Sequence, residues 1–260
     1  MSRIVCHFSC GAASAVATKL ILAEHDPEKV VIYNAFIQEE HADNRRFLAD
    51  CEKWFAHPVI VLRDEKYGAS THEVRKRKRF LSNGIYGAPC AAVLKREVID
   101  PHCLPDDIHV LGYTAEETKR VEKFRGKNDN KQALFPLWER GITHAEALGI
   151  VERAGIELPL MYRLGYNNAN CVGCCKGGEG YWNKIREDFP ETFAQVVQIQ
   201  TEIGPGSYLF RNRATGERFS LADLPPGKGR HDTELPDCGF ACAMAEQDIE
   251  EGYIGLWERS

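Results

Sequence analysis

An apolar stretch near the start of the chain passes through a loop of small residues into a helix-forming segment. Residues 4–8 (IVCHF) have the character of a buried strand, residues 9–11 interrupt it, and residues 12–24 favour a helix. A strand that turns directly into a helix leaves backbone N–H groups and the positive end of the helix dipole pointing at one spot. The sequence therefore predicts a binding site for phosphate or sulfate at residues 9–14.

Apolar runs and helix-forming segments alternate through the first half of the chain. Further strands are predicted at residues 29–36, 57–62 and 107–113, and helices at 43–55 and from 114 onward. This alternation is typical of an α/β fold with a doubly wound parallel sheet, which binds ligands at the carboxyl ends of its strands. We predict a nucleotide-binding α/β domain over residues 1–138 and a helical, irregular region with a Cys-rich metal site over residues 139–260.

Composition narrows the class of protein. The chain has 260 residues and a formal net charge of −5, which disfavours unspecific coating of nucleic acid. No apolar run approaches the roughly 18 residues of a membrane span, and the first residues do not form a signal peptide. We therefore expect a cytoplasmic protein without membrane contact, in which the ten cysteines are metal ligands, catalytic thiols or core residues rather than disulfides.

The first loop resembles the PP-loop of the ATP pyrophosphatase and phosphoadenylylsulfate (PAPS) reductase superfamily. The usual Ser-Gly-Gly-x-Asp-Ser reads here Ser9-Cys10-Gly11-Ala12-Ala13-Ser14. The resemblance implies that an adenine nucleotide is bound through Ser9, Cys10, Gly11, Ala12 and Ser14. Ala13 replaces the Asp that helps to hold Mg²⁺ and pyrophosphate, which disfavours splitting of ATP, although Mg²⁺ can still accompany the nucleotide; PAPS reductases also lack this Asp.

Residues 112–120 resemble a second segment of PAPS reductase relatives, Gly-x-Arg-x-x-Glu-Ser-x-x-Arg. Tyr113 replaces the first Arg of that pattern, and Arg120 matches the last one, so the resemblance implies that Arg120 binds the anion. Thr114 and Glu117 also have the spacing of a helix capping box. Two roles for Glu117 therefore stay open, helix capping and catalysis.

Residues 38–44 follow the second predicted strand and should reach the same edge of the sheet. They resemble the family's Asp-Thr-Gly…His-Pro-Glu/Asp segment without its Asp-Thr-Gly part. Asp43 is expected to cap the next helix, to contact the ligand, or to do both.

Three cysteines lie in a polar turn, Cys171-Val-Gly-Cys174-Cys175. Two thiols at this spacing can bind one ion, either zinc or an iron of an iron–sulfur cluster. Cys90 follows Pro89 at the start of a predicted helix, where the helix dipole favours the thiolate and hence metal binding.

The cysteine pattern resembles that of adenylylsulfate reductases, in which a Cys-Cys pair before an Arg-Lys helix and a later C-x-x-C hold a [4Fe–4S] cluster. Cys90 before Lys95, followed by Cys171 and Cys174, matches three of the four ligands, and Pro89 stands at the remaining position. The fourth ligand is Cys175, a cysteine of the Cys238/Cys242 pair, or absent. Structural zinc is the alternative to the cluster. We also expect Lys95 to contact the nucleotide anion.

Residues 237–242 (DCGFAC) resemble the Glu-Cys-Gly-x-His tail that carries the nucleophilic cysteine of the reductases. Cys238 would be that nucleophile, and Ala241 replaces the His. Cys242 follows, so the pair consists either of a nucleophile with a resolving cysteine or of two further metal ligands.

Residues 75–79 (RKRKR) carry the densest charge of the chain. Five consecutive side chains cover the whole circumference of a helix, so we expect a solvated, loosely ordered segment. The alternative is contact with phosphates of a nucleotide or of tRNA or DNA, which needs only positive charge.

The resemblance implies an enzyme of sulfur metabolism that reduces an adenylylated sulfate with a thioredoxin-like thiol partner. Cluster-assisted, ATP-dependent insertion of sulfur into tRNA or DNA is the second reading, and residues 75–79 favour it. A nucleotide-binding protein without catalysis, whose metal is structural, is the third reading.

Overall fold

Five short strands form the central sheet of the computed structural model, which describes residues 2–81, 88–126, 128 and 131–230. The strands are β1 (Ile4–His7), β2 (Val30–Phe36), β3 (Val59–Arg63), β4 (Ile108–Val110) and β5 (Gln132–Leu134). All pairings are parallel, in the order β3-β2-β1-β4-β5, and Ile4 is paired with both Val30 and Ile108. The predicted α/β class with a parallel sheet is confirmed, and the strand order is compatible with a doubly wound fold.

Helices connect the strands, and the first two match their predicted ranges. These are α1 (Ala12–Glu24) and α2 (Asp43–Phe55). The remaining helical elements, with the 3₁₀ and π turns labelled η, are η1 (Pro27–Lys29), α3 (Thr71–Lys78), α4 (Pro89–Ala91), the π turn η2 (Ala92–Arg96), α5 (Glu97–Ile99), η3 (Asp100–His102), η4 (Ala115–Glu117), α6 (Thr118–Arg125), α7 (Pro136–Glu139), α8 (His144–Arg153), α9 (Leu160–Arg163), α10 (Glu179–Asp188), α11 (Pro190–Ile203) and η5 (Pro205–Ser207). No helix in these described ranges is long and apolar enough to cross a bilayer.

The main core lies between the sheet and the helices α1, α2 and α8. Leu20 of α1, Phe47 of α2 and Leu148 of α8 are buried there together with Cys6 and Phe8. Burying a large apolar side chain contributes roughly 1.5–3 kcal/mol, so this layer holds α1 firmly at the end of β1. The helix α8 follows residue 138, yet it packs in the same core as the sheet. The predicted domain boundary after residue 138 therefore stays a prediction.

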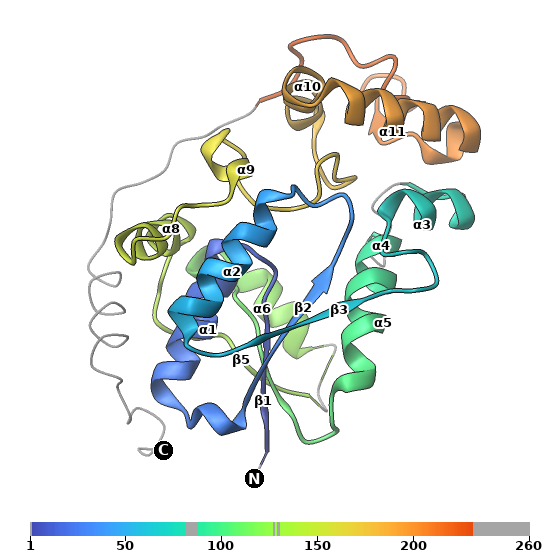
Figure 1. Ribbon diagram of the computed structural model, residues 1–260. Helices are drawn as coiled ribbons and strands as arrows, with labels where there is room; N and C mark the ends of the chain where they lie inside the picture. Colours follow the sequence, from blue (N-terminus) through green and yellow to red (C-terminus); the bar gives the residue numbers. More distant parts are fainter. Residues whose placement is uncertain (1, 82–87, 127, 129–130, 231–260) are drawn as a thin grey trace.

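A second core joins α10 and α11 to the segments around them. Trp182, Ile185, Val196 and Ile199 pack there with Phe210 of the small hairpin formed by β6 (Phe210–Arg211) and β7 (Arg218–Phe219). Figure 1 shows α10 and α11 at the end of the molecule opposite the N-terminus, with α3 next to α11. The cysteine-rich loop before α10 belongs to this second core, in which Val172 and Cys175 are buried.

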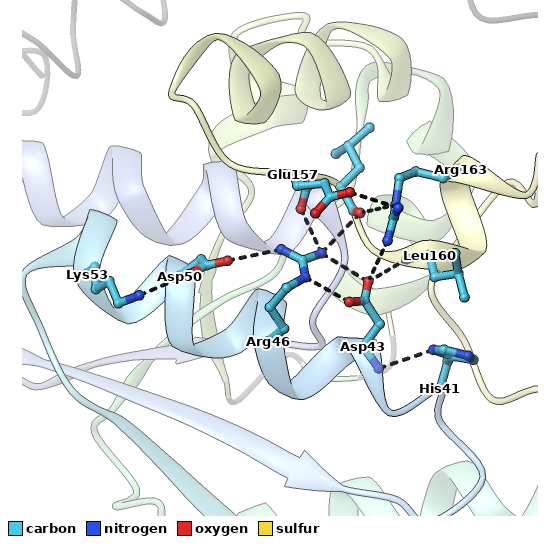
Figure 2. Close-up of polar contacts among 9 residues, drawn as sticks. His41, Asp43, Arg46, Asp50, Lys53, Glu157, Leu160 and Arg163 are labelled. Atoms are coloured by element: carbon cyan, nitrogen blue, oxygen red, sulfur yellow. Dashed lines mark hydrogen bonds and ion pairs between the residues drawn. The ribbon is translucent and has the colours of Figure 1, made fainter.

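Asp43 anchors α2 to the segment before α9. It is the first residue of α2, whose N-cap is Ala42, so the prediction that Asp43 is the N-cap is wrong. Its carboxylate accepts hydrogen bonds from Arg46 Nε and from the backbone N–H of Leu160, each at 2.7 Å, and pairs with Arg163 (Figure 2). The Arg46 hydrogen bond lowers the pKa of Asp43 to about 2. These contacts occupy the carboxylate, and Asp43 therefore has a structural role.

Candidate functional site

A cleft of about 1440 Å³ opens at the carboxyl ends of β1 and β4. These are the two strands between which the chain reverses its direction across the sheet, because β2 and β3 lie on one side of β1 and β4 and β5 on the other. Parallel sheets bind ligands at this kind of switch point. The walls are formed by the end of β1, the first turn of α1, residues 111–120 and residues 167–170. The two segments that resemble the PAPS reductase family thus face one another.

The predicted anion loop lines this cleft through Ser9, Gly11 and Ser14. The Ser14 hydroxyl donates to the Gly11 carbonyl at 2.9 Å and accepts from the Ser9 N–H at 3.1 Å, which fixes the turn. No side chain caps α1, and its first turn contains no acidic residue. The positive end of α1 therefore faces the cleft, and no acidic side chain of its own first turn offsets it; the acidic side chains of the cleft, Glu116 and Glu117, lie on the loop after β4. The Tyr162 hydroxyl lies beside the backbone N–H of Ala12 at the cleft wall.

The side chains of Cys10 and Ala12 point away from the cleft and are completely buried. Cys10 has a φ of 55°, in the left-handed region that a residue with a Cβ rarely adopts. Its sulfur accepts from Asn34 Nδ2 at 3.5 Å and from Arg45 Nη2 at 3.8 Å. Burial raises the pKa of Cys10 to about 12, so the thiol stays protonated. Both side chains therefore support the loop by packing in the core beneath it.

Gly112 brings the loop after β4 into contact with the start of α1. A Cβ at this position would lie 2.9 Å from the backbone C and O of Ala13 and from Cα of Ser14. Only glycine allows this approach without a shift of the backbone. Gly11 is less restricted, because a Cβ there would meet the Tyr162 hydroxyl at 3.2 Å, the end of a movable side chain.

Glu117 and Arg120 both line the cleft, on the side formed by the loop after β4. Glu117 accepts from the Thr114 N–H at 3.1 Å in a complete capping box, so its predicted capping role is confirmed and its catalytic role stays a prediction. Glu117 also forms an ion pair with Arg120, and the Arg120 guanidinium lies 4.3 Å from the centroid of the Tyr113 ring. Arg120 is thereby held over the cleft in a half-exposed position from which it can reach an anion.

His7 lines the cleft and is paired with His109 behind it. His7 Nε2 lies 2.9 Å from His109 Nδ1, across the neighbouring strands β1 and β4. Burial and the neighbouring His109 lower the pKa of His7 to about 4, so both rings are neutral at neutral pH and act as hydrogen-bonding groups. The sequence analysis did not single out His7; its place as the last residue of β1, next to the anion loop, was the available signal.

Four cysteines, from α4 and the loop before α10, lie close together. Cys90 is the second residue of α4, as predicted, and its sulfur is hydrogen-bonded to the Cys175 thiol, which also contacts Cys174. Cys171 completes the group, which we call the cysteine cluster. The loop is held by Tyr181, whose hydroxyl accepts from the Gly173 and Cys174 N–H groups at 3.0 Å and donates to the Cys171 carbonyl at 3.2 Å.

The cluster contains thiols in different protonation states. The Cys175 thiol lowers the pKa of both Cys90 and Cys174 to about 6, whereas burial raises the pKa of Cys171. Cys175 has a single S–H, which can donate to only one neighbour at a time, so the arrangement favours one thiolate next to Cys175, and the thiolate is the form that binds metals. Within the described part of the chain, no group of three or more His, Cys, Asp or Glu side chains already has the arrangement of a metal site. The metal site accordingly stays a prediction.

Lys95 lies between the cleft and the cysteine cluster. It lines the cleft, and its Nζ is 3.4 Å from Glu40 Oε1, while Arg45 pairs with the other oxygen of Glu40 at 3.4 Å. Although burial opposes it, Glu40 raises the pKa of Lys95, whose charge also acts on Cys171. The π turn η2 contains Lys95 and begins two residues after Cys90. One short helical segment thus contributes to both places.

The basic run differs from its prediction. Residues 75–78 belong to α3 and Arg79 ends it, so the expectation of a loosely ordered segment is wrong. The helix starts firmly because its first N–H groups are bonded by Ser70 Oγ and by the Glu39 carboxylate. Arg75 is buried against the cysteine loop, where it donates to the Gly173 carbonyl at 3.0 Å, and the other four side chains are exposed.

Cys238 and Cys242 lie outside the described residues, so the predicted nucleophile is not placed. Comparisons with protein-family models, with curated proteins and with solved structures find no match to this chain. The case for a function therefore depends on the site itself.

Proposed function

We propose that this chain is a PP-loop enzyme related to PAPS reductases, which binds an adenine sulfonucleotide in the cleft and an iron–sulfur cluster at the cysteine cluster. The observation that carries the proposal is the position of Lys95. This residue lines the cleft, and its positive charge also favours the thiolate form of Cys171. A single cation thus lies between an anion-binding loop and a group of thiols. Sulfonucleotide chemistry next to a cluster requires this arrangement of the two sites.

The cleft supports binding of a nucleotide anion. The open N-terminus of α1 supplies backbone N–H groups and a positive dipole. Lys95, Arg120 and Lys176 line the same cleft and outnumber its two carboxylates, Glu116 and Glu117. In this reading Glu117 orients Arg120 toward the sulfate or phosphate through their ion pair.

The cysteine cluster supports a metal–thiolate group. Cys90, Cys171 and Cys174 would be ligands, with Cys175 as the fourth, and thiolates suit both iron–sulfur clusters and zinc. When bound, a [4Fe–4S] cluster would supply a charged redox centre next to the sulfonucleotide. Bound inorganic sulfide distinguishes the cluster from zinc.

The proposed reaction is a two-step thiol reduction. The Cys238 thiolate attacks the sulfur of the sulfonucleotide; a sulfur–sulfur bond forms, the bond from sulfur to the phosphate oxygen breaks, and AMP or its 3′-phosphate leaves. A dithiol of a thioredoxin-like partner then attacks Cys238, so that sulfite is released and the partner is oxidised to a disulfide. The cations of the cleft stabilise the negative charge on the leaving nucleotide.

Anaerobic purification tests the proposal. We expect iron and inorganic sulfide in equal amounts, a broad absorption near ~400 nm, and binding of adenylylsulfate or PAPS in a panel of nucleotides. Sulfite release with a dithiol reductant should depend on Cys238. Zinc without sulfide would contradict the cluster, and nucleotide affinity without turnover with any sulfur compound would favour the non-catalytic reading.

A groove next to the cleft favours a second candidate function, sulfur insertion into tRNA or DNA. It has a volume of about 1070 Å³ and shares Asn167 and Asn168 with the cleft. Its walls carry four basic side chains and several aromatic rings, namely Arg211, Arg213, Lys228, Arg230, Tyr166, Tyr181, Phe210 and Phe219. Positive charge combined with aromatic rings suits a single-stranded nucleic acid. Retarded migration of tRNA, together with thiolated product in the presence of ATP, would favour this candidate over the reductase.

A further inference from the structure

Arg75 is a buried cation with unused hydrogen-bond donors. Its residue exposure is 3%, and its only hydrogen bond among the described residues runs from Nη2 to the Gly173 carbonyl. Nε and Nη1 are buried and have no hydrogen-bond partner in that part of the chain. Burial of an unpaired charge with free N–H groups is strongly unfavourable, so a native protein normally supplies an anion to such a group.

The surroundings of Arg75 are the cysteine cluster. Gly173, which accepts its one hydrogen bond, lies between Cys171 and Cys174 in the sequence. Val74, the preceding residue of α3, belongs to a small apolar group against which Cys90 and Cys171 pack. The charge of Arg75 also acts on Cys90, Cys174 and Cys175. The Arg75 side chain therefore lies beside the cysteine cluster.

Other cations near the cluster are already neutralised or exposed. Lys95 is paired with Glu40, and Lys176, whose charge also acts on Cys90 and Cys174, is exposed to solvent. No carboxylate pairs with Arg75 in the described ranges. Within the described residues, the buried positive charge of Arg75 thus has no anionic partner.

We infer that Arg75 is the buried counter-charge and hydrogen-bond donor of an anionic metal–thiolate group held by Cys90, Cys171, Cys174 and Cys175. This inference rests on the proposed function of the cysteine cluster. Several thiolates bring more negative charge than a zinc ion or an oxidised cluster core brings positive charge, so the complex is an anion. The free Nε–H and Nη1–H groups would donate to its sulfur atoms, as groups around metal ligands commonly do. Arg75 is then a positioning and tuning residue.

The test uses Arg75→Met, Arg75→Gln and Arg75→Lys in the full chain, prepared anaerobically, with Lys78→Met as a control on the exposed side of the same helix. Reduction adds negative charge to the cluster, and a nearby cation favours it. Loss of the charge should therefore make the reduction equilibrium constant about tenfold less favourable, a shift of about 59 mV to more negative potential for one electron. Iron release to a chelator should also become faster. Arg75→Lys should recover most of both effects, and Lys78→Met should match the wild type.

The outcomes separate this inference from the proposed function. If the wild type contains iron and sulfide and the folded Met and Gln variants keep its potential and its rate of iron release, the inference is wrong and the cluster stands. If the wild type contains zinc, the cluster is wrong, and unchanged zinc release in the same variants would overturn the inference as well. A wild type without any bound metal overturns both. Should Arg75→Met fail to fold, the comparison of Arg75→Gln with Arg75→Lys decides.

Discussion

The cleft and the cysteine cluster are neighbours built in different ways. The cleft lies at the ends of adjacent strands, so hydrogen bonding between β1 and β4 places its two sides. The cluster is assembled from α4 and the loop at residues 171–175, which is far from α4 in the sequence. Individual long-range hydrogen bonds help to position that loop. Val172 donates to the Glu39 carbonyl at 2.8 Å, and Asn44 Nδ2 donates to the Ala169 carbonyl at 3.1 Å.

The two places also differ in how completely their polar groups are satisfied. In the cleft, Ser9 and Ser14 bond each other, and Thr114 and Glu117 complete a capping box. In the described part of the cleft, the buried side-chain atom without a partner is a neutral ring nitrogen, His144 Nε2, whereas at the cluster Arg75 keeps two buried donors of a charged group without acceptors. We infer that the cleft is preorganised before its ligand binds, whereas the cluster depends on its ligand for part of its stability. Variants on the two sides should then lose different properties.

The largest effect is expected from Cys90→Ser. Loss of one ligand at the start of α4 should abolish iron binding, while the affinity for the nucleotide stays within about twofold because the cleft does not include this side chain. Iron and sulfide analysis with equilibrium binding measures both. Cys103→Ser serves as the control and should retain iron. Full iron content in Cys90→Ser would contradict the assignment of the cluster.

The regular part of this architecture is predictable from the sequence. Helix-forming composition after the small-residue loop predicts α1, and an apolar stripe at helical spacing predicts α2. The alternation of strands and helices predicts the parallel sheet and hence the edge where the cleft opens. The meeting of Cys90 with the loop at residues 171–175 follows only from the family resemblance, because nothing local in either segment specifies a partner so distant in the sequence.

Arg75 and Asp43 show what the sequence does not reveal. Five consecutive basic residues look equivalent, and only the packing of α3 against the cysteine loop decides that Arg75 is the one turned inward. An Asp at position 43 is the type of residue that caps a helix or binds a ligand. Its contacts with Leu160 and Arg163 instead give it a structural role. Both depend on long-range geometry that no local pattern carries.

Gly112→Val should weaken nucleotide binding and leave iron binding intact, the opposite of the result expected for Cys90→Ser. The new side chain would collide with the backbone of Ala13 and Ser14, which cannot move like the end of a side chain, and such overpacking costs about 3 kcal/mol. The displaced loop should weaken nucleotide binding at least about tenfold while iron binding persists. Gly206→Ala is the control, because a Cβ there meets nothing within 4 Å. Equal nucleotide affinity in the folded Gly112→Val protein would remove the anion loop from the site.

The histidine pair next to the cleft should make the stability of the folded protein depend on pH. Burial, with His109 next to it, lowers the pKa of His7 to about 4 from about 6.5 in the unfolded chain. The unfolded state therefore binds a proton first as the pH falls, so the stability from His7 is complete above about pH 6.5 and is lost as the pH falls toward 4. Between pH 7 and pH 5 this loss amounts to about 2 kcal/mol.

Urea unfolding of the wild type and of His7→Gln at both pH values measures the effect. Gln can still bond His109 but does not titrate, so the difference in unfolding free energy between the two proteins should change by about 2 kcal/mol from pH 7 to pH 5. Histidines away from this pair contribute equally to both proteins and cancel, so the difference reports on His7 together with its partner His109. Parallel pH curves would show that His7 is not held neutral.

The smallest effect is expected from replacing the exposed part of the basic run, Lys76, Arg77, Lys78 and Arg79, by Gln while Arg75 is kept. The pairs of Lys76 with Glu202 and Arg77 with Glu73 are exposed, and surface ion pairs contribute about 0–1 kcal/mol each. Sulfonucleotide turnover, iron content and nucleotide affinity should all stay within about twofold, because these side chains reach neither the cleft nor the cluster.

If the protein instead binds nucleic acid through this helix, we expect a different result. Each lost phosphate contact would lower the salt dependence of binding by about 0.9 in the log–log slope on duplex DNA, which a gel shift across salt concentrations detects. A shallower slope with unchanged iron would assign α3 two separate faces, the buried one toward the cluster through Arg75 and the exposed one toward nucleic acid.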